Sequence, residues 1–172
     1  ELSKDALKPL YNRALLATYP PGSTYKMNMV VAAMEAKLID SKTTIVDRGV
    51  YDKIPGWEVS CLQWTNYGGT HGAVNAAEAL MVSCNYFFYT VGYRLSLVDG
   101  EYTSLQGLNI LEEYATSLGL NMKTGVEIEE NAPRFSSTDS VRTAIGQGTS
   151  GFATVQLARY ANCLADTGNN YK

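Results

Sequence analysis

The chain has 172 residues with a net charge of −3, and 45% of its residues are hydrophobic. This length and composition are sufficient for one domain with a packed core. Nucleic acid is excluded as an expected partner, because no basic stripe is present to neutralise phosphates. No run of about 18 apolar residues occurs, so no segment of the sequence is expected to cross a membrane.

Near the start of the chain, residues 3–17 contain Pro9 and are expected to form a loop or a short helix. Residues 19–26 follow, with the sequence Tyr-Pro-Pro-Gly-Ser-Thr-Tyr-Lys. Two consecutive prolines cannot continue a helix, and the glycine after them permits a sharp turn. Residues 27–38 have almost no polar face and predict a strong helix. The eight-residue stretch is therefore expected to end one element and to begin the next.

Ser23 and Lys26 form a Ser-x-x-Lys pair inside this stretch. Ser23 is expected at the helix N-terminus, where backbone N–H groups are free, and Lys26 one turn later on the same face. A serine becomes a good nucleophile when a base takes its proton, and a lysine can be that base when burial lowers its pKa. The alternative is a helix-capping Ser23 and a solvated Lys26.

Residues 43–47 are largely β-branched and predict a short strand. Residues 48–72 are rich in glycine, aromatic and polar residues and are expected to be loop, with Trp57 and Trp64 covering part of the molecule. The remaining expected elements are helices over residues 75–82, 86–95, 105–118 (closed by Gly119) and 153–166, a short strand over 124–129, a loop over 131–139 and a glycine-punctuated turn over 141–148.

The turn Ser83-Cys84-Asn85 separates two of these helices, which are both expected to be buried. Buried polar groups need hydrogen-bond partners. A serine and an asparagine that share one turn can direct both side chains at one site. The alternative is that Ser83 or Asn85 caps a helix.

The chain contains three cysteines, Cys61, Cys84 and Cys163, and this odd number permits one disulfide at most. Free buried thiols are the expected state. Cys61 and Cys84 could instead bind a structural Zn²⁺ with His71, the one histidine, and Asp52 could add a carboxylate. The spacing matches no standard zinc motif, so inert thiols and a His71 that hydrogen-bonds a loop remain the alternative.

Taken together, these motifs resemble those of the class B, monofunctional penicillin-binding proteins, which belong to the serine β-lactamase and DD-peptidase superfamily. Residues 19–26 are similar to the family's nucleophile segment, residues 69–72 and 83–89 to its second motif with its lead-in, and residues 144–148 to the segment before its third. The resemblance covers nearly the whole chain. It implies an α/β (α+β) fold of the β-lactamase/DD-transpeptidase type, of which this chain supplies mostly the helical subdomain and part of the α/β core.

The resemblance also implies a role for each residue of the two motifs. Ser23 would be the nucleophile that is acylated by a peptidoglycan stem peptide, and Lys26 the base that deprotonates it. Ser83 would relay a proton to the leaving amine, and Asn85 would hold Lys26 and the substrate amide. The backbone N–H of Ser23 would form half of the oxyanion hole.

The family's third motif, Lys-Thr/Ser-Gly, lies on a strand that edges the active site. Residues 123–125 have the sequence Lys-Thr-Gly, but they precede residues 144–148, whereas the family's triplet follows that segment. We therefore expect Lys123 to be non-catalytic. We expect residues 1–172 to be a transpeptidase-domain fragment that lacks the C-terminal strand with the third motif.

The implied activity is a D,D-transpeptidase that cross-links stem peptides without a required cofactor. β-Lactams would acylate Ser23 and remain bound. Other cell-wall synthesis proteins would be partners. The implied location is the extracytoplasmic face of the cell membrane, with a membrane anchor outside this chain.

Two alternatives to the transpeptidase remain open. The first is a β-lactam-sensing domain or a catalytically silent penicillin-binding module. The second is a β-lactamase, because Glu127 and Asn131 have the Glu-x-x-x-Asn spacing of one β-lactamase class. A β-lactamase needs such a base to activate the water that releases the acyl group.

Overall fold

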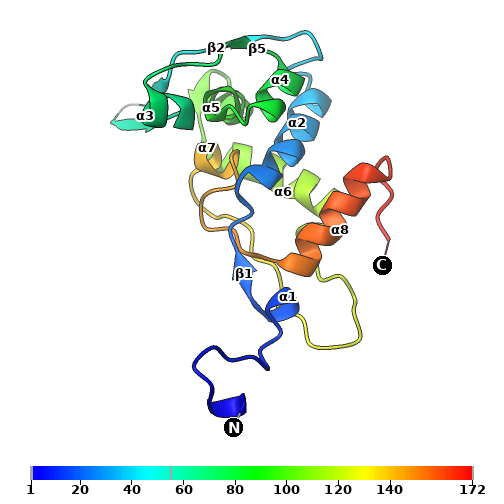
Figure 1. The fold of residues 1–172 in the computed structure, drawn as a ribbon. Coiled ribbons are helices and arrows are strands. Elements are labelled where there is room, and N and C mark those ends of the chain that lie inside the picture. The colour runs from blue at the N-terminus through cyan, green and yellow to red at the C-terminus, as the bar shows by residue number, and fades with distance from the viewer. Residues whose placement is uncertain (1, 55, 172) are drawn as a thin grey trace.

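The computed structural model describes residues 2–54 and 56–171 of the chain. Its elements are short and mostly helical (Figure 1). In chain order they are η1 (Leu2–Lys4), α1 (Arg13–Leu16), β1 (Thr18–Tyr19), η2 (Gly22–Tyr25), α2 (Lys26–Glu35), β2 (Ile45–Asp47), β3 (Val50–Ile54), β4 (Trp57–Ser60), α3 (Leu62–Tyr67), β5 (Gly72–Val74), α4 (Ala76–Met81), α5 (Asn85–Leu95), β6 (Leu97–Val98), β7 (Glu101–Tyr102), α6 (Ser104–Ser117), α7 (Ser140–Thr143), β8 (Phe152–Ala153) and α8 (Thr154–Ala165).

The core forms where α2, α5, α6 and α7 meet. Met29 of α2, Phe87 and Phe88 of α5, and Leu111 of α6 are fully buried there. These helices lack a continuous polar stripe because neighbouring elements cover them on more than one side. In Figure 1, α5 runs beneath β2 and β5, while α8 and α1 lie on the other side of α6. The core therefore holds the start of α2 and the start of α5 in fixed positions.

The strands in the described residues form four antiparallel pairs, β1–β8, β2–β5, β3–β4 and β6–β7. The β1–β8 pair joins distant parts of the chain, with Thr18 opposite Ala153. The β3–β4 pair is a hairpin whose register shifts between Tyr51 and Ile54. The short β1 strand brings the chain directly to the nucleophile segment predicted from the sequence.

The predicted helices are confirmed as α2, α4, α5, α6 and α8. Helix α2 ends at Glu35, earlier than predicted, because Lys37 adopts a left-handed backbone conformation with φ of 56°. Gly119 has φ of 79° just after α6, as expected for a residue that closes a helix. None of the helices within residues 2–54 and 56–171 has both the length and the apolar character needed to cross a membrane.

Two predictions of local structure were wrong. Residues 48–72 are not a loop, because β3, β4 and α3 lie there and Tyr51 of β3 is buried in the core. Residues 124–129 do not form a strand, because Thr124 donates its backbone N–H and its hydroxyl to the buried Glu130 carboxylate. This local hydrogen bonding replaces the pairing that a strand would need.

Candidate active site

Ser23 lies in the 3₁₀ helix η2, directly before α2, and is exposed. The turn before it is held by a hydrogen bond from the Gly22 backbone N–H to the Gly146 carbonyl, 3.0 Å long. Gly146 has φ of 72°, and a Cβ atom on it would overlap the Gly22 carbonyl oxygen. The segment of residues 144–148 therefore packs against the backbone of the nucleophile turn.

Lys26 begins α2 and is only 1% exposed. Its amine Nζ donates to the Ser83 carbonyl at 2.9 Å, to Ser83 Oγ at 2.8 Å and to Asn85 Oδ1 at 2.6 Å. The amine also lies 5.3 Å from the centre of the Phe88 ring, a cation–π distance. Burial lowers the pKa of Lys26 to about 8, so the neutral amine is accessible near neutral pH.

Ser83 occupies the turn between α4 and α5 in a left-handed conformation, with φ of 53°. Its hydroxyl donates to Ser23 Oγ at 3.1 Å and accepts from Lys26 Nζ. Such a conformation is costly for a residue other than glycine and concentrates at functional sites. Here it lets the carbonyl and the hydroxyl of Ser83 contact the same amine.

The structure brings all four predicted catalytic side chains into one hydrogen-bonded group. The predicted position of Ser23 next to the start of a helix is found, and so is the polar turn of Ser83 and Asn85. The bond that links Ser23 to this group comes from Ser83, because the described residues include no hydrogen bond between Lys26 and Ser23. Neither Ser83 nor Asn85 caps α5, whose N-cap residue is Cys84.

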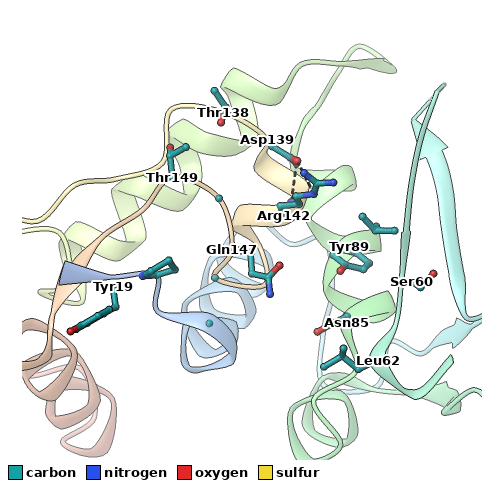
Figure 2. Close-up of a pocket in the computed structure, with 15 residues that line it drawn as sticks. Tyr19, Ser60, Leu62, Asn85, Tyr89, Thr138, Asp139, Arg142, Gln147 and Thr149 are labelled. Atoms are coloured by element: carbon teal, nitrogen blue, oxygen red, sulfur yellow. Dashed lines mark hydrogen bonds and ion pairs between the residues drawn. The ribbon is translucent and has the colours of Figure 1, made fainter. Parts of the chain in front are cut away.

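An open groove of about 1090 Å³ lies beside this group and includes Gly22 and Asn85 in its lining. Figure 2 shows Asn85 and Tyr89 of α5 on one side of it, Gln147 facing them, and Arg142 above Tyr89. Its walls thus combine aromatic, amide and charged groups, a mixture that suits a peptide.

Arg142 is a groove residue that the sequence did not single out. It pairs with Asp139 at 3.5 Å, and its guanidinium lies 5.3 Å from the centre of the Trp57 ring. The signal available in the sequence was a positively charged residue, Arg142, within residues 141–148, which were predicted to form a glycine-punctuated turn. Its contact with Trp57 comes from the β3–β4 hairpin, which was predicted to be loop, so its place in the groove could not be foreseen.

The other two motifs considered from the sequence lie elsewhere. Thr124, Gly125 and Glu127 line a separate hollow with Arg159 of α8. The carbonyl of Lys123 accepts a hydrogen bond from Arg159 at 3.0 Å. The Lys-Thr-Gly triplet and Glu127 are therefore absent from the lining of the groove in the described residues.

A second side-chain cluster lies at the start of α5. Asp47, Cys61, His71 and Cys84 each offer one ligand atom, and these atoms lie within 4.8 Å of one another. The predicted trio of Cys61, His71 and Cys84 is therefore brought together. The carboxylate comes from Asp47 of β2, whereas Asp52 is exposed on β3 and is absent from the group.

Hydrogen bonds connect this cluster. His71 Nδ1 lies 2.8 Å from Asp47 Oδ2, and Cys84 Sγ donates to the same oxygen at 3.6 Å. Burial opposes ionisation of Asp47, but hydrogen bonds from Gly49 and His71 outweigh it and lower its pKa. The neighbouring Cys84 thiol lowers the pKa of Cys61. Two thiols, an imidazole and a carboxylate form the donor set that suits Zn²⁺.

Comparisons with known proteins identify the class. The model of the penicillin-binding protein transpeptidase domain family matches residues 2–172. The peptidoglycan D,D-transpeptidase MrdA of Escherichia coli is 30% identical over 182 residues, which cover 97% of this chain and 26% of MrdA. The chain therefore spans about a quarter of the length of this relative.

Solved structures agree with the family model. PBP2 of Helicobacter pylori in complex with MreC has a TM-score of 0.81 and 25% identity, covering 96% of this chain and 31% of that chain. The imipenem acyl-enzyme of penicillin-binding protein A from M. tuberculosis has a TM-score of 0.77 and 26% identity. The match covers 97% of this chain and 37% of that chain. The chain belongs to the penicillin-binding protein transpeptidase domain family, and the predicted α/β (α+β) fold is confirmed.

Proposed function

We propose that this chain carries the serine acyl-transfer site of a peptidoglycan D,D-transpeptidase. The observation that carries the proposal is the chain of hydrogen bonds from the Lys26 amine through the Ser83 hydroxyl to Ser23. It joins a nucleophile to a base whose pKa is lowered by burial. The name of the E. coli relative supports peptidoglycan as the substrate.

In the acylation step, Ser23 Oγ attacks the carbonyl between the two D-alanines of a stem peptide. The Oγ–C bond forms while the Ser23 proton passes through the Ser83 hydroxyl to neutral Lys26. The C–N bond then breaks, and the proton returns from Lys26 through Ser83 to the leaving amine of D-alanine. An amine of a second stem peptide then attacks the acyl carbonyl. The new C–N bond forms, the C–Oγ bond breaks, and the amine proton passes through Lys26 and Ser83 to Ser23 Oγ.

Asn85 has a positioning role in this proposal, because its Oδ1 holds the Lys26 amine at 2.6 Å. Its side chain also lines the groove, where its amide could contact a substrate amide. Ser23 lies in the first turn of η2, where the backbone N–H groups lack intrahelical partners. Its N–H therefore supplies one donor for the oxyanion that forms in the tetrahedral intermediate.

The third motif belongs to a strand outside residues 1–172 in this proposal, which makes the chain a fragment of the transpeptidase domain. Support comes from the position of residues 123–125, which pack near α8 rather than along the groove. That strand would edge the groove and complete the oxyanion hole.

β-Lactams are the inhibitors that this site would bind. Imipenem forms an acyl-enzyme with the M. tuberculosis neighbour, which supports a penicillin adduct on Ser23. The complex of the H. pylori neighbour with MreC supports cell-wall synthesis proteins as partners. A membrane-anchored parent protein with this domain on the extracytoplasmic face is consistent with peptidoglycan as substrate.

The proposed cofactor is a structural Zn²⁺ held by Asp47, Cys61, His71 and Cys84, with no part in the chemistry of acyl transfer. The four donors come from β2, the start of α3, the segment before β5 and the start of α5. Four N, O and S donors are the number that a tetrahedral structural zinc needs.

The deciding experiment is intact-mass analysis of the full-length protein after incubation with a penicillin, followed by peptide mapping. A single adduct on Ser23 that persists for hours is the expected result. An adduct that is lost within minutes would favour a β-lactamase, and a folded sample without adduct would reject the serine acyl-transfer site. Formation of cross-linked stem peptides then separates a transpeptidase from a β-lactam sensor, which would acylate without giving that product.

A further inference from the structure

A second pocket lies on the side of α5 where β2 and β3 pack, away from the catalytic groove. Its volume is about 470 Å³. The residues that line it come from β2 and its flanks, β3, α5 and the start of β6, and they include Arg48, Tyr51, Lys53, Tyr86, Tyr93 and Arg94. None of them belongs to the catalytic group or to the Asp47 cluster. In Figure 1, α5 lies directly beneath β2.

The charged residues in this lining are all cations, although the whole chain carries a net charge of −3. Arg48, Lys53 and Arg94 come from three different segments, and each is exposed. In the described residues none of the three forms an ion pair or a side-chain hydrogen bond. Asp52 neighbours Lys53 in β3, but it lines a different hollow with Trp57, since successive strand residues face opposite sides.

Tyr51 lines the pocket with a donor that has no acceptor. The side chain is only 2% exposed, and its hydroxyl has no hydrogen-bond partner. Its ring packs edge-on against Tyr86, with centroids 5.5 Å apart, and also contacts Tyr93. Burial keeps the pKa of Tyr51 well above its usual range, while the nearby Arg94 acts in the opposite direction. The hydroxyl is therefore a protonated donor without a partner, on a side chain that lines this pocket together with Tyr86, Tyr93 and Arg94.

We propose that this pocket binds an organic anion, a carboxylate or phosphate group carried on a small apolar or aromatic body. Arginine forks donate to either group in two parallel hydrogen bonds, and Lys53 adds a third positive charge. The Tyr51 hydroxyl supplies a neutral donor, and the side chains of Tyr86, Tyr93, Ile45 and Leu97 line the space for the apolar body.

The site is independent of the acyl-transfer proposal, since in the described residues none of its side chains hydrogen-bonds to Ser23 or Lys26. It shares α5 with the catalytic group, however, because Tyr86 directly follows Asn85 in the chain. A ligand in the pocket would therefore contact the helix whose first residue holds Lys26.

The test is calorimetric titration of the full-length protein with 4-bromobenzoate and 4-bromophenyl phosphate, with uncharged 4-bromobenzamide as the control probe. At least one anion should bind saturably and more weakly at higher ionic strength, and the amide should not bind. The tighter of the two anions identifies the preferred group. A bromine anomalous peak between β2 and α5 in soaked crystals should place the probe.

Three variants test the contacts. Arg48→Gln and Arg94→Gln should each weaken anion binding about tenfold, because each removes a charge-assisted hydrogen bond. Tyr51→Phe keeps the ring and should weaken binding by a few-fold. Lys37→Gln removes an exposed charge at the end of α2, outside the pocket, and should leave affinity unchanged. Equal binding of the amide, a bromine peak in the catalytic groove, or the same affinity for Arg94→Gln and Lys37→Gln would overturn the proposal.

Discussion

The Lys26 amine makes three hydrogen bonds, which is the full donor capacity of a protonated lysine. A neutral amine has two N–H donors and one lone pair, and it could accept the Ser83 proton instead. The hydroxyl of Ser83 would then accept from Ser23. Loss of one proton from Lys26 therefore reverses the direction of both hydrogen bonds in the Lys26–Ser83–Ser23 chain. With a protonated Lys26 the chain donates to Ser23 Oγ, and with a neutral Lys26 it can accept the Ser23 proton.

This reversal predicts the pH dependence of acylation. Below pH 8 most Lys26 amines are protonated and cannot accept the Ser23 proton, because burial sets the pKa at about 8. The rate of acylation by a penicillin should therefore rise about tenfold per pH unit well below 8 and level off above it. Stopped-flow measurement between pH 6 and 9.5 checks this. A rate that stays flat over this range would remove Lys26 from the role of base.

Replacing Ser83 tests the relay. Ser83→Ala removes the hydroxyl between Lys26 and Ser23 and should slow acylation by roughly 10²-fold or more. Ser83→Gly also removes the hydroxyl, but it relieves the positive φ of 53° and should be more stable than Ser83→Ala by up to about 1 kcal/mol. Penicillin acylation rates and urea unfolding separate the two effects. An active Ser83→Gly variant would show that the slow Ser83→Ala variant suffers from backbone strain.

Among the elements, the turn at residues 144–148 supports the nucleophile from outside its own segment. Gly146→Ala would place a Cβ against the Gly22 carbonyl oxygen in a left-handed conformation, so it should destabilise the protein by about 2 kcal/mol or more and slow acylation. Gly125→Ala is the matched control, because Gly125 also has a positive φ, of 86°, but has open space around its Cβ position. It should cost about 1 kcal/mol and leave acylation unchanged. Thermal unfolding and acylation rates of the two variants give the comparison.

Elements were predictable where their signal is local. Helix α5 is a long apolar sequence, and α6 has a recognisable end at Gly119, so the sequence located both helices. The β3–β4 hairpin was missed because its strands are short and its register shifts near Ile54. Its stability comes from contacts with α5, which no local pattern records. Because the hairpin was missed, part of the groove was missed as well, since Val59 and Ser60 of β4 form part of its wall.

In the candidate site, too, the features with a local sequence signal were predictable and those that depend on the fold were not. Ser23, Lys26, Ser83 and Asn85 were recognised from two short motifs, because each motif keeps its residues within one turn of backbone. The order of the hydrogen bonds was not predictable, since it depends on the left-handed backbone of Ser83. Asp47 was missed as the fourth member of the Cys61–Cys84 cluster because the register of β2 against β5 brings it to His71.

At the scale of the whole molecule, the Asp47 cluster ties together four segments that are separated by 10 to 14 residues along the chain. A metal ion that binds only the folded arrangement of these four residues would stabilise the fold by mass action, by about 4 kcal/mol at a free concentration a thousandfold above its dissociation constant. Cys84 also lies between Ser83 and Asn85. A metal bound to its thiolate would therefore hold the turn that positions the Lys26 amine.

These positions predict that the full-length protein binds one Zn²⁺ per chain. Cys61→Ser should lose the metal, unfold at a lower temperature and acylate more slowly, because the turn at Cys84 loses its anchor. Cys163→Ser is the matched control, since Cys163 is equally buried but lies in α8 and outside the cluster. A chelator should lower the melting temperature of wild type and Cys163→Ser while leaving Cys61→Ser unchanged. Elemental analysis gives the metal content, and wild-type protein that is fully stable and metal-free would leave the two thiols as ordinary buried side chains.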